Sequence, residues 1–246
     1  MSWTNYKDKL SKYFWFSNEE WKAFIITVLV GALIYSWNSW GDVQFDAAQG
    51  VKSLIIAIFL VALAVFVHHA AQRMFALTLG FKVEHKLWWY GLIIGLMLAI
   101  PTGGSSIFFF FAASGTLIHL MPIHRLGAFR YGPNLATFSK IAFAGPFASA
   151  LLAYLAKLLI ALDIVSPSAG HRFFMLNAMF ALMNILPIPP LDGSRIFFSS
   201  RAEYLFVFLA FAAFAFIGYA FQIYSLTAAL LVGIGGSLLI MWLKKG

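Results

Sequence analysis

The chain has 246 residues, of which 62% are hydrophobic and 11% are charged, and its formal net charge is +8. An average soluble domain is about 25% charged, so this composition excludes a soluble globular protein. The chain contains no cysteine, which excludes disulfides, thiolate metal ligands and a cysteine nucleophile.

Apolar runs follow one another along the chain, each near the length of about 20 residues that a helix needs to cross a bilayer. The first expected span is Ala23–Trp40, and Ser17 and Glu20 precede it at the spacing of a capping box. The second is Leu54–Leu79, which ends at Gly80, a residue suited to a helix C-cap.

The second half of the chain continues the same pattern. Trp89–Leu120 contains shorter apolar stretches that are compatible with a helical hairpin or a partly extended segment. Further spans are expected over Lys140–Ala161, from Arg172 onward, and over Tyr204–Phe221 and Leu226–Leu243. The sequence therefore predicts an all-α polytopic membrane protein with about six transmembrane helices, which form a single membrane domain over residues 1–246.

The basic residues are distributed unevenly between the expected loops. If the N-terminus is cytosolic and Trp89–Leu120 crosses the membrane an even number of times, all but three of the 17 basic residues lie toward the cytosol. The exceptions are Lys52, Lys157 and Arg172. This bias predicts that both termini are cytosolic. It also accounts for the net charge through contact with the lipid bilayer, so no nucleic-acid partner is expected.

An acidic residue stands beside a broken helix in the stretch NILPIPPLDGSR, Asn184–Arg195. Pro187, Pro189 and Pro190 cannot continue a regular helix, so the helix must break before Asp192. A charge in hydrocarbon costs several kcal/mol unless it is paired, ligated or hydrated, which makes Asp192 a candidate site residue. Broken backbone at membrane depth is tolerated where protein buries it or where it lines a cavity.

A second polar group lies on the span Leu54–Leu79, in the stretch VFVHHAAQRMF. It contains His68, His69, Gln72 and Arg73. Gln72 and Arg73 are expected at the interfacial end of the helix, where the Arg73 side chain reaches toward water.

The predicted orientation places both polar groups toward the cytosol. His68 and Asp192 lie toward the cytosolic ends of their helices, where the two side chains can meet. The following stretch FKVEHK, with Glu84 and His85, is expected to be a solvated cytosolic loop.

The stretch NILPIPPLDGSR resembles the Asn-x-x-Pro-x-Pro-x-Leu-Asp-Gly motif of the site-2 protease family, which are intramembrane zinc metalloproteases. The resemblance implies that Asp192 is the third zinc ligand and that Asn184 lies in the substrate groove with Pro187 and Pro189. AGPFASALL resembles the family's Ala-Gly-Pro helix start, at Ala144–Pro146. The resemblance covers a protease-like core of about residues 54–200, and the C-terminal helices at about 204–243 lie beyond it.

The family's His-Glu-x-x-His motif falls on His-His-Ala-Ala-Gln in this chain. His68 keeps the first histidine, whereas His69 replaces the general-base glutamate and Gln72 replaces the second histidine. A catalytic zinc needs three protein ligands and an open position for water, and a neutral amide is a poor ligand. His69 points about 100° away from His68 on a helix, so both cannot readily hold one ion. Zinc is therefore expected to bind weakly or not at all.

These features predict a pseudoprotease, a protease-like protein that does not hydrolyse. It would bind or scaffold a transmembrane partner between the His68 helix and the Asn184–Asp192 segment. One alternative is an active intramembrane zinc metalloendopeptidase in which His68, Asp192 and His69 hold the metal. Another is a structural subunit of a membrane assembly. Asn184 is also compatible with a hydrogen bond between helices.

Overall fold

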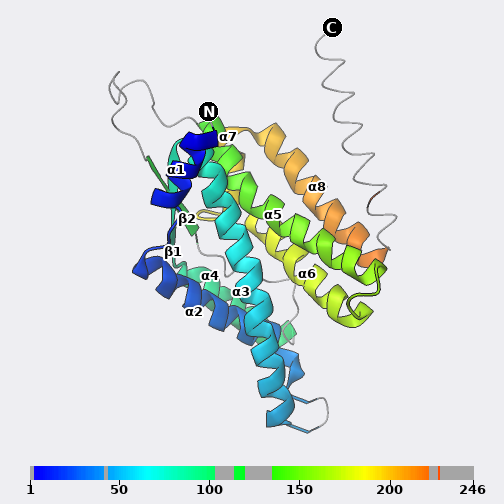
Figure 1. Cartoon of the computed structure of the whole chain (residues 1–246). Helices are drawn as coiled ribbons and strands as arrows, with labels where there is room; N and C mark the ends of the chain where they lie inside the picture. Colours follow the sequence, from blue (N-terminus) through cyan, green and yellow to red (C-terminus); the bar gives the residue numbers. More distant parts are fainter. Residues whose placement is uncertain (1–2, 42–43, 103–113, 120–134, 222–226, 228–246) are drawn as a thin grey trace, which may run out of the picture.

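The computed structural model describes residues 3–41, 44–102, 114–119, 135–221 and 227, and most of these residues are helical (Figure 1). The helices are α1 (Trp3–Tyr13), α2 (Asn18–Tyr35), the short 3₁₀ helix η1 (Trp37–Ser39), α3 (Ala47–Thr78), α4 (Trp89–Thr102), α5 (Leu135–Ala161), α6 (Pro167–Asn184), α7 (Asp192–Ser199) and α8 (Arg201–Ala220).

Two strands, β1 (Phe81–Lys86) and β2 (Ser114–His119), form an antiparallel pair in which Phe81 lies opposite His119. The prediction of an all-α fold is wrong at this point. FKVEHK, expected to be a solvated loop, is strand β1 because its backbone pairs with a segment about 30 residues further along the chain. The partly extended alternative for Trp89–Leu120 agrees with the helix α4 and the strand β2.

Three helices, α3, α5 and α8, are long and apolar enough to cross a membrane. Their exposed faces carry large apolar side chains such as Phe59, Leu151 and Phe206, as expected for surfaces in contact with hydrocarbon. Helices α2 and α6 have 18 residues each and do not belong to this set. The number of about six spans therefore stays a prediction, and the expected span Leu226–Leu243 lies outside the described residues apart from Thr227.

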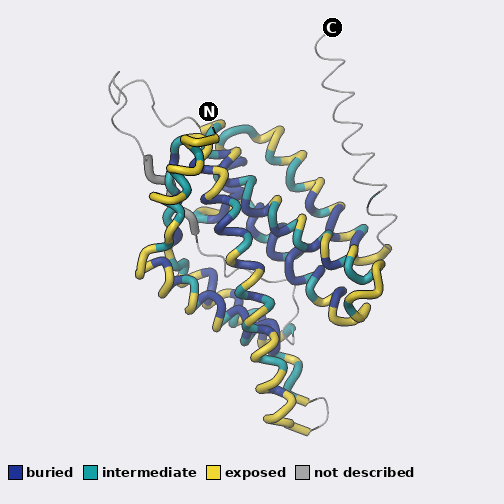
Figure 2. Tube along the Cα trace, viewed as in Figure 1, coloured by how far each residue is buried: buried dark blue, intermediate teal, exposed yellow. Residues whose placement is uncertain are grey.

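Helix α5 occupies the centre of the bundle, where it contacts α3, α6 and α7. Helix α2 packs on α3 and on α4, whereas α8 packs on α6 and α7 (Figure 1). The buried residues gather where α3, α5 and α6 approach one another, and the N-terminal end of α3 is mostly exposed (Figure 2). The middle and C-terminal half of α3 thus present one buried face to the rest of the protein.

The ends of α2 and α3 follow from their capping residues. The capping box predicted for α2 is confirmed, because Ser17 accepts from the backbone N–H of Glu20 and the Glu20 carboxylate accepts from the backbone N–H of Ser17. Helix α3 begins seven residues before the expected Leu54, because Asp46 caps it through the backbone N–H of Gln49. Gly80 follows its end with φ +83°, a conformation that favours glycine.

The chain breaks between α6 and α7, as the prolines predicted. Helix α6 ends at Asn184 and α7 begins at Asp192. A Cβ atom on Gly193 would lie 1.8 Å from the carbonyl oxygen of Ile185, so only glycine allows α7 to pack this closely on the end of α6. This contact fixes the position of the neighbouring Asp192.

Candidate functional site

His68 and Asp192 meet in the interior of the protein. The His68 Nε2 atom lies 3.1 Å from Asp192 Oδ2, and its Nδ1 atom lies 3.0 Å from the hydroxyl of Ser149 on α5. The exposed fraction of His68 is 1% and that of Asp192 is 5%. Three helices, α3, α5 and α7, therefore contribute to one buried polar cluster.

Gln72 completes this cluster from the next turn of α3. Its amide nitrogen donates a 2.8 Å hydrogen bond to Asp192 Oδ1, and Arg195 makes a longer contact of 3.4 Å with the same oxygen. Both carboxylate oxygens of Asp192 thus have partners on the protein. We call His68, Gln72, Ser149 and Asp192 the carboxylate cluster.

The Ala-Gly-Pro stretch contributes space for the carboxylate cluster. A Cβ atom on Gly145 would lie 2.5 Å from His68 Nε2, so the imidazole fits against α5 because this position has no side chain. The expectation that Ala144–Pro146 starts a helix is wrong, since α5 begins at Leu135 and continues through Pro146. A proline inside a helix removes one backbone hydrogen bond, and α5 contains Pro146 without ending there.

The adjacent face of α3 carries a separate buried network around Arg73. The Arg73 guanidinium pairs with Glu20 on α2 and donates to the carbonyl oxygens of Phe14, Trp15 and Val83 at 3.0, 2.8 and 2.7 Å. Its exposed fraction is 0%. The expectation that Arg73 reaches toward water from an interfacial helix end is therefore wrong, because this side chain finds an anion and three carbonyls inside the protein.

His69 lies beside this network and faces His85 on β1. Their ring centroids are 3.8 Å apart, and their exposed fractions are 3% and 5%. Burial holds the pKa of His85 well below its usual range, and the positive charge of Arg73 acts in the same direction. The nearby backbone of His69 acts in the opposite direction on this pKa. The expectation that His85 belongs to a solvated loop is wrong, since pairing with β2 and packing on α3 bury it.

The remaining predicted residues lie along the break between α6 and α7. Asn184 is buried, and its amide donates to the carbonyl of Phe180 in its own helix at 2.8 Å. Pro187 and Pro189 are exposed on either side of Ile188. An exposed, irregular segment therefore lies three to five residues before the buried Asp192.

The carboxylate cluster does not fit a catalytic zinc ion. It offers one imidazole and one carboxylate, and the third position is held by the neutral amide of Gln72, which donates to the carboxylate. Within the part of the chain that the structure describes, no group of three or more His, Cys, Asp or Glu residues is arranged to hold a metal ion. The geometry is that of a closed hydrogen-bond network.

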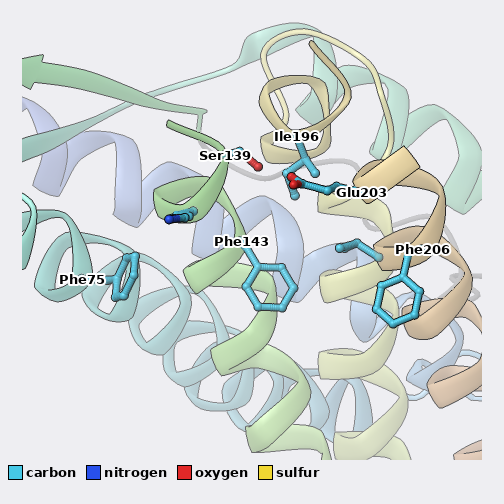
Figure 3. Close-up of a pocket in the computed structure, with 8 residues that line it drawn as sticks. Phe75, Ser139, Phe143, Ile196, Glu203 and Phe206 are labelled. Atoms are coloured by element: carbon cyan, nitrogen blue, oxygen red, sulfur yellow. The ribbon is translucent and has the colours of Figure 1, made fainter. Parts of the chain in front are cut away.

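A cavity of about 290 Å³ lies between α3, α5, α7 and α8 (Figure 3). The side chains of Phe75, Phe143 and Phe206 form much of its apolar wall, and Lys140 and Glu203 also line it. None of the eight residues that line it belongs to the carboxylate cluster. The cavity can accept an apolar group, but it gives that group no contact with Asp192.

Sequence reasoning missed four contributors to these networks. Ser149 and Gly145 contact His68 from α5, and their spacing of four residues on the Ala-Gly-Pro helix could have placed both on one face. Arg73 and Glu20 form a buried pair between α3 and α2, which no local pattern relates.

The chain is similar to a curated protein whose name is that of a metalloprotease. A curated protein of Methanocaldococcus jannaschii, named "putative zinc metalloprotease", is 28% identical over 192 residues, which cover 74% of this chain and 85% of that protein. No family model matches the chain. A search of the solved structures also gave no significant match.

Proposed function

We propose that this protein is a pseudoprotease of the site-2 protease type that binds a transmembrane partner without cutting it. The observation that carries the proposal is the hydrogen bond from Gln72 to Asp192. An amide donates there where the family motif has a zinc-binding imidazole, so the carboxylate is occupied by protein donors. The name of the archaeal relative supports the metalloprotease side of the proposal.

The chemistry of residue 69 supports the absence of hydrolysis. A general base must lie within hydrogen-bond reach of the water that it activates. His69 faces His85 and β1, whereas the carboxylate cluster lies on the face of α3 that holds His68 and Gln72. The pseudoprotease therefore lacks both a third metal ligand and a base directed at the Asp192 carboxylate.

The break between α6 and α7 is the proposed contact for the partner. Pro187, Ile188 and Pro189 are exposed, and the two prolines have no N–H groups for a helix. The partner would lie against the exposed side chains of this irregular segment. Both termini lie in the cytosol in this proposal, and about six helices cross the membrane, as the sequence predicts.

A photo-crosslinking residue at position 188 tests the binding step. We expect it to capture a membrane protein of intact length. The same crosslinking residue at position 59 is the matched control. Phe59 is exposed on α3, outside the break between α6 and α7, so this position should capture lipid or nothing specific. Equal capture at both positions would overturn the proposed partner surface.

Rebuilding the motif tests the degenerate site. The double variant His69→Glu, Gln72→His should bind about one zinc ion per chain, and the partner captured at position 188 should then be shortened. Adding Asp192→Asn to the double variant should abolish both effects. Cleavage by the unmodified chain that is lost in Asp192→Asn would instead establish the enzyme alternative.

A further inference from the structure

The cavity between α3, α5, α7 and α8 opens on the apolar surface of the helix bundle (Figure 3). Three of these helices, α3, α5 and α8, are long and apolar enough to cross a membrane. Phe75 of α3 and Phe206 of α8 line the cavity, and their exposed fractions are 39% and 62%. The cavity is therefore a groove that the acyl chain of a neighbouring lipid can enter from the side.

The lining of this groove is polar at one end and apolar along the rest. Figure 3 shows Ser139 and Glu203 at the upper end, with Phe143 and Phe206 below them. Lys140 follows Ser139 on α5 and also lines the groove. Helix α5 has 27 residues, about 40 Å, which matches a bilayer of about 40–45 Å with its headgroups. The charged residues, in the first two turns of α5 and α8, therefore stand at the level of lipid headgroups.

Lys140 and Glu203 have opposite charges but do not pair with each other. Within the part of the chain that the structure describes, neither side chain forms an ion pair. Ser200 accepts from the backbone N–H of Glu203, whereas its own N–H donates to Ile196, so the Glu203 carboxylate takes no part in this cap. The dipole of α8 favours a carboxylate in its first turn, but it does not explain a lysine on α5 beside the same apolar groove.

We propose that this groove binds a phospholipid with a primary ammonium in its headgroup, such as phosphatidylethanolamine. One acyl chain lies along Phe143 and Phe206, the phosphate meets the Lys140 ammonium, and the lipid ammonium meets the Glu203 carboxylate. Lysine binds phosphate as a point charge, and basic pockets between transmembrane helices bind lipid headgroups. A primary ammonium offers three N–H donors to a carboxylate, whereas the quaternary ammonium of choline offers none.

The size of the groove favours a lipid chain over a protein segment. Its volume of about 290 Å³ lies at the lower limit of ligand pockets, which is roughly 300 Å³. An α-helix is about 10 Å across with its side chains and cannot enter a space of this size. An anionic lipid such as phosphatidylglycerol would satisfy Lys140 but place no cation beside Glu203. The groove shares no residue with the partner segment around Ile188, so this proposal is independent of the proposed function.

Lipid binding by the full chain tests the proposal. The chain is stripped of lipid in detergent and titrated with phosphatidylethanolamine, phosphatidylcholine or phosphatidylglycerol of identical acyl chains, and bound lipid is counted by native mass spectrometry. We expect phosphatidylethanolamine to bind about threefold more tightly than phosphatidylcholine, as one exposed ion pair allows. Glu203→Gln should remove this preference, and Lys140→Gln should weaken the binding of all three lipids. Glu19→Gln and Lys22→Gln, which change exposed residues of α2, are the matched controls and should leave lipid binding unchanged.

A photoreactive acyl chain locates the bound lipid without any change to the protein. Phosphatidylethanolamine with a diazirine in one chain should label Phe143, Phe206 or Val207 more than Phe59, which is exposed on α3 outside the groove. Equal labelling of Phe59 would overturn the proposal. Tighter binding of phosphatidylglycerol, or a preference for ethanolamine that survives Glu203→Gln, would also overturn it. Circular dichroism and size exclusion check that each variant folds, and the labelling decides the position of the lipid whichever variants do.

Discussion

Two faces of helix α3 hold polar residues at the same four-residue spacing but use them in different ways. His68 and Gln72 face α5 and α7, where they bond the Asp192 carboxylate. His69 and Arg73 face α2 and β1, where the guanidinium is held by an anion and three carbonyls while the imidazole pairs with no described side-chain donor or acceptor.

The difference shows that one polar stretch of α3, His68–Arg73, contributes to two separate structures. The face that carries His68 and Gln72 is closed by its own hydrogen bonds. The face beside it combines a buried ion pair with two imidazoles that have no described hydrogen-bond partner. A helix places consecutive residues about 100° apart, so the residue at position 69 can make contacts of its own without disturbing those of His68.

The largest effect is expected from breaking the ion pair on the β1 face. Glu20→Gln keeps a side chain that can still cap α2 but removes the anion from Arg73. Removing one partner of a buried ion pair costs about 3–5 kcal/mol, so the midpoint of thermal unfolding in detergent should fall sharply. Glu19→Gln, an exposed neighbour in the same helical turn, should leave the midpoint nearly unchanged. Equal effects of the two variants would contradict the buried pair.

A smaller effect is expected from changing the carboxylate on the other face. Asp192→Asn replaces one carboxylate oxygen by an NH₂ donor and removes the negative charge, so Gln72 and His68 can both keep their contacts only if His68 Nε2 becomes the acceptor. The cost should be about 1–3 kcal/mol of unfolding free energy, measured by denaturant titration in detergent. Asp163→Asn is the control, because Asp163 is exposed and asparagine tolerates its φ of 54°. An unchanged unfolding free energy in Asp192→Asn would contradict a stabilising role of the carboxylate cluster.

A steric change at Gly145 should act on the same cluster through His68. Gly145→Ala brings a methyl group against the imidazole, and overpacking of this kind costs about 1–3 kcal/mol. The double variant Gly145→Ala, His68→Ala removes the ring that the methyl group would meet. In a double-mutant cycle, the double variant should therefore lose less unfolding free energy than the sum of the losses in the two single variants. Strict additivity would show that Gly145 is not required by His68.

The smallest effect is expected from the hydroxyl that orients His68. Ser149→Ala removes a single hydrogen bond to Nδ1 and should lower the unfolding free energy by about 0.5–1.5 kcal/mol. Ser139→Ala changes another buried serine on α5 and is the matched control, which should lower the unfolding free energy by less. An identical response of both variants would remove Ser149 from the carboxylate cluster.

The sequence predicted those parts of the molecule that local rules or one motif determine. Ser17 and Glu20 predicted the start of α2, and the prolines before Asp192 predicted the end of α6. The sequence also predicted that His68 and Asp192 can meet, from the polar stretches that hold them and from the charge bias that places both toward one side of the membrane. In the structure, His68 Nε2 lies 3.1 Å from Asp192 Oδ2.

The parts that failed depend on contacts between distant segments. The burial of His85 requires β1 to pair with β2, and strand pairing depends on neighbours that a local pattern does not contain. Arg73 looked interfacial because a charge near the end of an apolar run normally reaches for water. Its acceptors come from the N-terminal segment, α2 and β1, which periodicity along α3 cannot reveal.

The acceptors of Arg73 have a practical consequence for handling the protein. Two of its four oxygen partners are the carbonyls of Phe14 and Trp15, which precede the first long apolar run. A chain shortened to begin at Ser17 would retain α2 to α8 yet leave a guanidinium in the interior with half of its acceptors missing. The stretch that looks most dispensable for expression is thus a structural strap, and affinity handles are better attached upstream of it than substituted for it.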